Sequence, residues 1–165
     1  MRSSAIGNFL FPSLNKKFLI RIVLVALGCF LIFGYLLVPM RIQGSSMEPT
    51  YRDKSFAFCW RLQYLFAKPE RFDVVAVRFS GRNVMLLKRV VALPGESVEF
   101  RKGMLYVNGL AIEEPYVVYR SDWELSPRKV APEHVYIVGD NRGTTMDGHK
   151  FGEVDMKRII GRVFP

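Results

Sequence analysis

The segment MLYVNGLAI, residues 104–112, gives the clearest indication of the fold. Short apolar runs stand on either side of Asn108-Gly109, a dipeptide typical of two-residue β-hairpin turns because both of its residues tolerate positive φ. The segment therefore predicts two antiparallel strands joined by a tight turn.

Similar runs continue on both sides of this hairpin, divided by turn residues such as Pro94-Gly95. The predicted strands are residues 55–60, 73–80, 84–93, 97–100, 104–107, 110–112, 116–119, 134–138 and 159–164. Since no internal repeat or low-complexity linker divides them, we expect one mainly β, antiparallel domain over residues 41–165. Residues 62–68 form either a short helix or an apolar loop on a membrane surface, and Pro69 ends the segment in both cases.

A long apolar segment precedes the β region. Residues 22–39, IVLVALGCFLIFGYLLVP, carry no charge, and Phe18-Leu19-Ile20 extends the run beyond Arg21. As a helix this length rises roughly 30 Å, the thickness of a bilayer core, so residues 18–40 are predicted to be a transmembrane helix. A cleavable signal peptide is the alternative, but its apolar region would be shorter and would precede a small-residue cleavage site.

The distribution of charge favours a membrane over nucleic acid as the partner. The chain has a formal net charge of +9. Residues 1–41 contribute more than half of this charge, because they contain no acidic residue. Lys16, Lys17 and Arg21 precede the apolar segment, so the positive-inside rule places residues 1–17 in the cytoplasm. We therefore expect a single-pass protein of the inner (plasma) membrane, in contact with phospholipid, with an extracytoplasmic domain.

Metal and disulfide chemistry are not indicated. Cys29 lies in the apolar segment and Cys59 in a predicted strand, so the two are not expected to pair. Neither His134 nor His149 stands in a metal-binding spacing. We expect no metal and no cofactor, and the sequence does not indicate the oligomeric state.

Three segments contain residues suited to catalysis: GSSMEPT at 44–50, KRVVALPGE at 88–96 and GDNRGTTMD at 139–147. The first begins just behind the apolar segment, so its chemistry would take place near the bilayer. Considered alone, Ser45 or Ser46 in a Gly-Ser loop is more typical of a turn than of a nucleophile.

Lys88 is more informative because it lies among apolar residues in VMLLKRVVAL. Period-two alternation puts Leu86, Lys88 and Val90 on one face of a strand. If that face is buried, desolvation lowers the pKa of the lysine and suits it to act as a general base. If the strand is an exposed edge, the ammonium reaches solvent instead.

Together, in this order behind an apolar segment, the three segments resemble the bacterial type I signal peptidase family over about residues 41–165. That family has Ser-Met-x-Pro-Thr after its membrane segment, then Lys-Arg and Pro-Gly-Asp/Glu, then Gly-Asp-Asn-Arg followed by a hydroxyl residue and Asp-Ser-Arg. The resemblance implies an antiparallel β-sheet catalytic domain of the signal peptidase type. It also implies a serine endopeptidase that cleaves signal peptides from exported preproteins.

Matched position by position, the resemblance makes Ser46, rather than Ser45, the nucleophile, and it makes Lys88 the general base. The substrate is expected to bind as an added strand, with small residues one and three positions before the cut. Four residues match apolar positions of the family's substrate subsites: Ile42, Met47, Leu86 and Leu87.

The supporting residues follow from the same match. Arg89 is expected to pair with Asp147, and the hydroxyl of Thr145 is expected to orient the Lys88 ammonium. Gly44 stands where some members carry a serine whose hydroxyl completes the oxyanion hole. Because glycine has no such hydroxyl, backbone N–H groups are expected to supply the donors of the oxyanion hole in this chain. The chain departs from the family at Gly148-His149, where Ser-Arg is usual.

Alternatives remain open. Ser46 could act with His134 or His149 and an aspartate, which would make Lys88 incidental. The same Ser/Lys dyad could serve a mitochondrial inner-membrane or a plasmid-transfer peptidase of the same superfamily. A catalytically inert, membrane-tethered β module that binds a partner protein would retain the motifs without cleavage.

Overall fold

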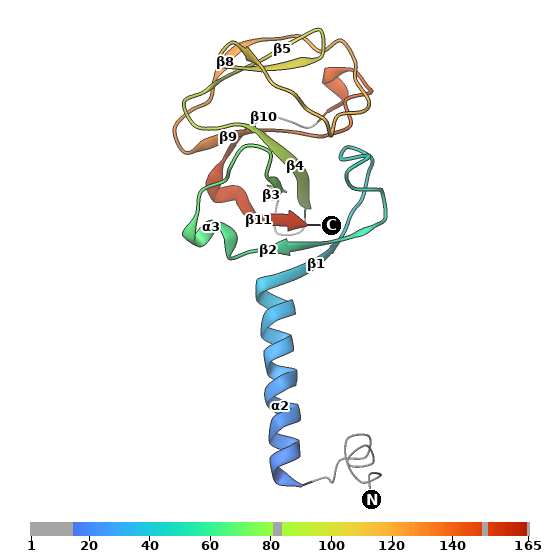
Figure 1. Ribbon diagram of the computed structural model, residues 1–165, viewed down its shortest axis with the longest axis vertical. Coiled ribbons are helices and arrows are strands. Elements are labelled where there is room, and N and C mark those ends of the chain that lie inside the picture. Colours follow the sequence, from blue (N-terminus) through green and yellow to red (C-terminus); the bar gives the residue numbers. More distant parts are fainter. Residues whose placement is uncertain (1–14, 81–83, 150–151, 165) are drawn as a thin grey trace, which may run out of the picture.

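The computed structural model describes residues 15–80, 84–149 and 152–164. Figure 1 shows a long N-terminal helix, α2, that leads directly into a β domain. In this domain the larger sheet lies next to the helix, and the smaller sheet lies at the far end.

The helix is long enough to cross a bilayer. α2 spans Lys16–Leu31 and continues as a π-helical turn, Ile32–Leu36. Asn15 caps its first turn, because its Oδ1 accepts a hydrogen bond from the backbone N–H of Phe18 at 2.8 Å. The combined helix of 21 residues rises about 32 Å, and by length and composition it can span a membrane.

The helix ends earlier than the predicted boundary at residue 40. Leu37–Arg41 forms β1, which pairs antiparallel with β2, Phe56–Trp60. Pro39 would interrupt a helix, but it fits an edge strand, and β1 is the edge strand of its sheet. Residues 1–14 of the predicted cytoplasmic segment lie outside the described residues.

The larger sheet has the strand order β1-β2-β11-β3-β4-β9-β10, and its neighbouring strands are antiparallel. Its other strands are β3 Val74–Ser80, β4 Val84–Ala92, β9 His134–Val138, β10 Gly152–Asp155 and β11 Ile159–Phe164. One buried cluster lies on β3, β4 and β9, and it consists of Val75, Val77, Val90, Val135 and Ile137. A second cluster packs the segment after β1 against the sheet through Ile42, Met47, Tyr51, Ala57, Cys59, Val74, Ala76 and Val163.

The smaller sheet has the order β7-β6-β5-β8. Its strands are β5 Ser97–Arg101, β6 Met104–Val107, β7 Leu110–Ala111 and β8 Leu125–Lys129. The predicted hairpin is confirmed, since β6 and β7 pair across Asn108 and Gly109, whose φ values are 52° and 79°. A third buried cluster joins the two sheets and includes Val91, Phe100, Leu105, Trp123 and Val138.

The mainly β, antiparallel fold class is confirmed, with one predicted strand wrong. Residues 116–119 turn instead of pairing, and the Val117 N–H donates to the Glu114 carbonyl at 3.1 Å. Tyr116 packs against buried charged groups here: its hydroxyl donates to the Glu114 carboxylate at 2.7 Å, and its ring centre lies 3.9 Å from the Arg89 guanidinium. Of the two possibilities for residues 62–68, a short helix is observed, α3 Gln63–Phe66.

Candidate active site

Ser46 and Lys88 meet although they lie far apart in the sequence. The side-chain nitrogen of Lys88, Nζ, donates a hydrogen bond to Ser46 Oγ at 2.7 Å. Lys88 lies within β4 opposite Val75 of β3, and its side chain is only 3% exposed. The expectation of a buried lysine is therefore confirmed, and the alternative of a lysine reaching solvent from a strand edge is wrong.

The segment that carries Ser46 is fixed against the end of β9. The backbone N–H of Asn141 donates to the Ser46 carbonyl at 3.1 Å, and its side-chain amide donates to the Ser45 carbonyl at 3.1 Å. The Tyr51 hydroxyl, further along the segment, donates to the Val163 carbonyl at 3.0 Å. Burial raises the pKa of Tyr51 to about 12, so this hydroxyl stays protonated at neutral pH.

Gly139 makes this close approach possible. A Cβ at residue 139 would lie 2.3 Å from the Ser46 carbonyl oxygen and 3.3 Å from Lys88 Nζ. No side chain fits at the first distance without moving the backbone of the Ser46 segment. Glycine at residue 139 therefore allows Ser46 and Lys88 to lie in their observed positions.

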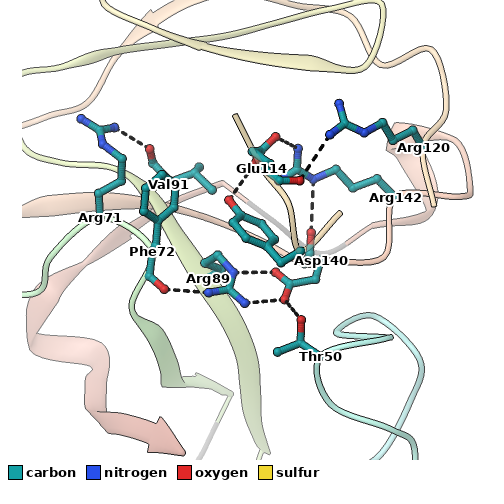
Figure 2. Close-up of polar contacts among 11 residues, drawn as sticks. Thr50, Arg71, Phe72, Arg89, Val91, Glu114, Arg120, Asp140 and Arg142 are labelled. Carbon is teal, nitrogen blue, oxygen red and sulfur yellow. Dashed lines mark hydrogen bonds and ion pairs between the residues drawn. The ribbon is translucent and has the colours of Figure 1, made fainter. Parts of the chain in front are cut away.

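Asp140 joins the three sequence segments. It accepts hydrogen bonds from Arg89 Nε at 2.8 Å and Nη2 at 2.6 Å, and from the Thr50 hydroxyl at 2.5 Å, as Figure 2 shows. Arg89 also donates to the Phe72 carbonyl at 2.8 Å. Burial alone would lower the pKa of Arg89, but the hydrogen bonds and charge of Asp140 outweigh it and raise this pKa.

The expected pairing of Arg89 with Asp147 is therefore wrong, because the partner is Asp140. The strand register explains the choice: Arg89 lies opposite Val138, the last residue of β9, and Asp140 follows only two residues later. Asp147 instead lies in a short 3-10 helix, Met146–Gly148, and is exposed.

A second buried ion pair lies beside the first. Arg142 binds Glu114 with two hydrogen bonds, at 2.6 and 2.5 Å, and Arg120 donates to the Glu114 carbonyl at 3.3 Å (Figure 2). The Arg142 N–H also donates to the Tyr119 carbonyl at 3.0 Å. These contacts tie the connection between β7 and β8 to the segment that carries Asp140.

Thr144, rather than Thr145, lines the hollow that contains Lys88. Thr145 is exposed and starts the short 3-10 helix, where its carbonyl accepts from the Gly148 N–H at 3.1 Å. Thr144 lines the same hollow as Lys88, and its hydroxyl lies 2.5 Å from Nε2 of His149. The orienting role of Thr145 stays a prediction, without a described contact that supports it.

Two hollows meet at Ser46. The first, of about 350 Å³, is lined by all four residues predicted to bind substrate, Ile42, Met47, Leu86 and Leu87. The second, of about 400 Å³, contains Lys88 with Asn141, Thr144 and His149. Gly44 lines both hollows, and its N–H donates to Asp53 Oδ1 at 2.8 Å.

Neither histidine takes the place of Lys88. His134 lies at the start of β9, where its Nδ1 is 2.8 Å from the Pro132 carbonyl. His149 shares the second hollow with Ser46, but its Nε2 contacts Thr144. Within residues 15–80, 84–149 and 152–164, no three His, Cys, Asp or Glu side chains are placed to hold a metal ion.

Sequence reasoning missed four residues that shape the site: Gly139, Asp140, Asn141 and Glu114. The first three stand in the GDNR segment, so the motif itself marked them, but it did not show which aspartate Arg89 binds. Glu114 had no such signal, because it stands in an irregular connection far from the motifs.

Comparisons with known proteins identify the family of this chain. A family model described as signal peptidase, peptidase S26, matches residues 15–165. The chain is 30% identical over 154 residues to a probable signal peptidase I-2 of Synechocystis, which covers 90% of this chain and 69% of that protein. It is also 30% identical over 151 residues to a signal peptidase I of Bacillus licheniformis, covering 85% of this chain and 81% of that protein.

Among solved structures, a crystal structure of a signal peptidase I from Enterococcus faecalis matches at 30% identity and a TM-score of 0.48. The match covers 58% of this chain and 97% of that one. From the family model and the relatives, the chain belongs to the signal peptidase family, peptidase S26, and is a serine endopeptidase.

Proposed function

We propose that this peptidase cleaves N-terminal signal peptides from preproteins with Ser46 as nucleophile and Lys88 as general base. The observation that carries the assignment is the 2.7 Å contact between Lys88 Nζ and Ser46 Oγ. Burial of Lys88 supports it, because a site sheltered from water disfavours an ammonium and favours the neutral amine that a base requires. The inert-module alternative is not favoured, since the chain belongs to a peptidase family.

Acylation follows from this geometry. Neutral Lys88 takes the proton of Ser46 Oγ, and Oγ attacks the carbonyl carbon of the scissile peptide bond. Backbone N–H groups near Ser46 stabilise the oxyanion, because Gly44 offers no side-chain donor. When the C–N bond breaks, protonated Lys88 gives its proton to the leaving amine.

Deacylation repeats the same transfers with water. Lys88 takes a proton from a water molecule, the hydroxide attacks the ester carbonyl, and the bond to Ser46 Oγ breaks. Lys88 then returns the proton to Oγ, so serine and lysine are restored. These steps require no metal or cofactor.

The first hollow suits the part of the substrate before the cut. It is lined mostly by apolar side chains next to Ser46, and it extends along β1 to Pro39 and Met40. Small side chains one and three residues before the cut would point into it from an extended peptide, because alternate residues of a strand share a face.

We place the β domain, residues 41–165 together with β1, on the extracytoplasmic side of the plasma membrane. Support comes from Lys16, Lys17 and Arg21 at the start of the helix and from the membrane association of the family. A protease added to intact spheroplasts should then digest the β domain. If the domain is digested only after lysis, the orientation is the reverse.

The same arrangement brings apolar side chains near lipid. Phe66 and Leu65 of α3 are 88% and 69% exposed, and α3 lies at the end of the domain from which α2 emerges (Figure 1). A Phe66→Trp variant in vesicles should show extra fluorescence that brominated acyl chains quench. Leu110→Trp, in the distant sheet, should show no such quenching. Equal quenching of the two would contradict this contact.

The dyad is tested by substitution in the full-length protein in detergent or vesicles, incubated with a preprotein. Ser46→Ala and Lys88→Met should each reduce cleavage at the mature N-terminus below detection, whereas Ser45→Ala should retain it. Thermal unfolding checks that the inactive variants fold. A folded Lys88→Met protein that still cleaves would instead favour a histidine as the base.

A further inference from the structure

The two hollows that meet at Ser46 differ in the residues that line them. The first is lined mostly by apolar side chains, with Arg41 and Gln43 among them, and it does not include Lys88. The second contains Lys88 and a polar wall formed by Thr144 and His149. A peptide with its scissile carbonyl at Ser46 therefore meets different surroundings on the two sides of the cut.

The proposed reaction decides which hollow receives which side. Lys88 must protonate the amine that leaves, so the nitrogen of the scissile bond has to lie within hydrogen-bond reach of Nζ. Since Lys88 lies in the second hollow, the residues after the cut extend into that hollow. The acyl part of the substrate remains in the first.

We propose that His149 and Thr144 form the subsite for the first residue after the cut, and that they select a small polar side chain there. This inference rests on the proposed dyad and adds a specificity determinant to it. A serine or aspartate side chain can hydrogen-bond with the Thr144 hydroxyl and the imidazole. A large apolar side chain would bury these polar groups without replacing their hydrogen bonds with water.

Trp123 contacts both residues of this wall. Trp123, which is 1% exposed, donates from Nε1 to the Thr144 carbonyl at 2.7 Å. The His149 ring stands edge-on to the Trp123 ring, with the ring centres 4.7 Å apart and the planes at 66°. The pair at 2.5 Å between Thr144 and His149 is thus fixed by a residue of the core that joins the two sheets.

The imidazole acts here as a neutral group. Burial lowers the pKa of His149, and the positive charges of Arg142 and of protonated Lys88 lower it further. At the neutral or alkaline pH at which a lysine base operates, the ring offers hydrogen bonds and no charge of its own.

The experiment measures kcat/KM for two peptides that differ only in the first residue after the cut, serine or leucine. The wild-type enzyme should prefer serine, and His149→Phe should reduce the ratio of the two kcat/KM values about tenfold. Phenylalanine can still stack on Trp123, so the variant removes the polar group and keeps a ring. Thr144→Val should reduce the ratio similarly, and the double variant should reduce it little further.

Controls separate specificity from general damage. A structural defect lowers kcat/KM for both peptides alike and leaves their ratio unchanged. His134→Gln, which lies outside both hollows, should also leave the serine-to-leucine ratio unchanged. A second pair of peptides differs only in the residue before the cut, and His149→Phe should leave the ratio of their kcat/KM values unchanged. An unchanged serine-to-leucine ratio in both His149→Phe and Thr144→Val overturns this inference alone. Failure of the wild-type enzyme to cut any peptide overturns the proposed function.

Discussion

Arg89 and Asp140 form a two-pronged, buried ion pair, with Nε–Oδ1 and Nη2–Oδ2 distances of 2.8 and 2.6 Å. Asp140 has no exposed surface, and Arg89 is 9% exposed. Lys88 precedes Arg89, and Asn141, which binds the Ser46 carbonyl, follows Asp140. The ion pair therefore holds Lys88 close to the segment that supports Ser46.

Removal of the Asp140 charge should damage stability and activity together. In Asp140→Asn the buried Arg89 loses its counter-charge, so we expect a loss of about 3 kcal/mol in the free energy of unfolding and a strong reduction in cleavage. Thermal unfolding and a preprotein assay measure the two effects. Asp147→Asn is the matched control, since that exposed carboxylate should matter by less than about 0.5 kcal/mol. Equal effects of the two substitutions would contradict the pairing with Asp140.

Gly139→Ala should reduce activity more than stability. The added Cβ would lie 2.3 Å from the Ser46 carbonyl oxygen, so the Ser46 segment must move away from Lys88. A displacement of this kind can lower kcat about 100-fold. Gly28→Ala in α2 is the control, because nothing lies within 4 Å of a Cβ there. Wild-type kcat in Gly139→Ala would show that the close approach is not required.

Glu114→Gln should destabilise the protein although Glu114 lies outside the motifs. The substitution leaves the Arg142 guanidinium, 1% exposed, without a compensating charge, at a cost of about 3 kcal/mol. Arg101→Gln provides the comparison, because it breaks a pair with Glu99 in which the arginine side chain is 53% exposed. Solvent screens such a pair, so its loss should cost much less stability. Chemical denaturation compares the two variants. If Arg101→Gln proves the more harmful, burial does not determine the contribution of these pairs.

His149 should make the folded protein less stable in acid. Burial and the nearby positive charges lower its pKa from the ordinary 6.5, so the folded state binds this proton more weakly than the unfolded state. The contribution of His149 to stability is present above pH 6.5 and is lost as the pH falls through 6.5 and then through the lower folded-state pKa. His149→Phe should show a smaller fall in Tm between pH 7.5 and 5 than the wild type. Parallel Tm profiles would show that His149 titrates normally.

The strands that the sequence predicted well are those with clear apolar runs between turn residues, such as β6 and β9. Those it missed lie at sheet edges or are short and polar. β1 was hidden because Leu37 and Val38 continue the apolar anchor, and β8 because Ser126-Pro127-Arg128-Lys129 is polar and contains a proline. An edge strand tolerates both features, since one side of it needs no partner.

The catalytic pair could be predicted because its motifs are distinctive, whereas the partner of Arg89 could not. Two aspartates, Asp140 and Asp147, stand in the same segment, and sequence spacing alone favours neither. The choice depends on the register of β4 against β9, which is fixed by the packing of the whole sheet. Glu114 was missed for the same reason, because only the folded chain brings it to Arg142.

The π-helical turn Ile32–Leu36 passes directly into β1, so no loop separates the apolar helix from the domain. Ser46 follows β1 after a few residues, so the end of the helix sets its height above the bilayer. The enzyme would then select substrates by distance from the membrane. A scissile bond reaches Ser46 only when the apolar helix of the substrate ends at a matching depth. Lengthening the spacer between that helix and the cut should abolish cleavage even when the residues around the cut are ideal.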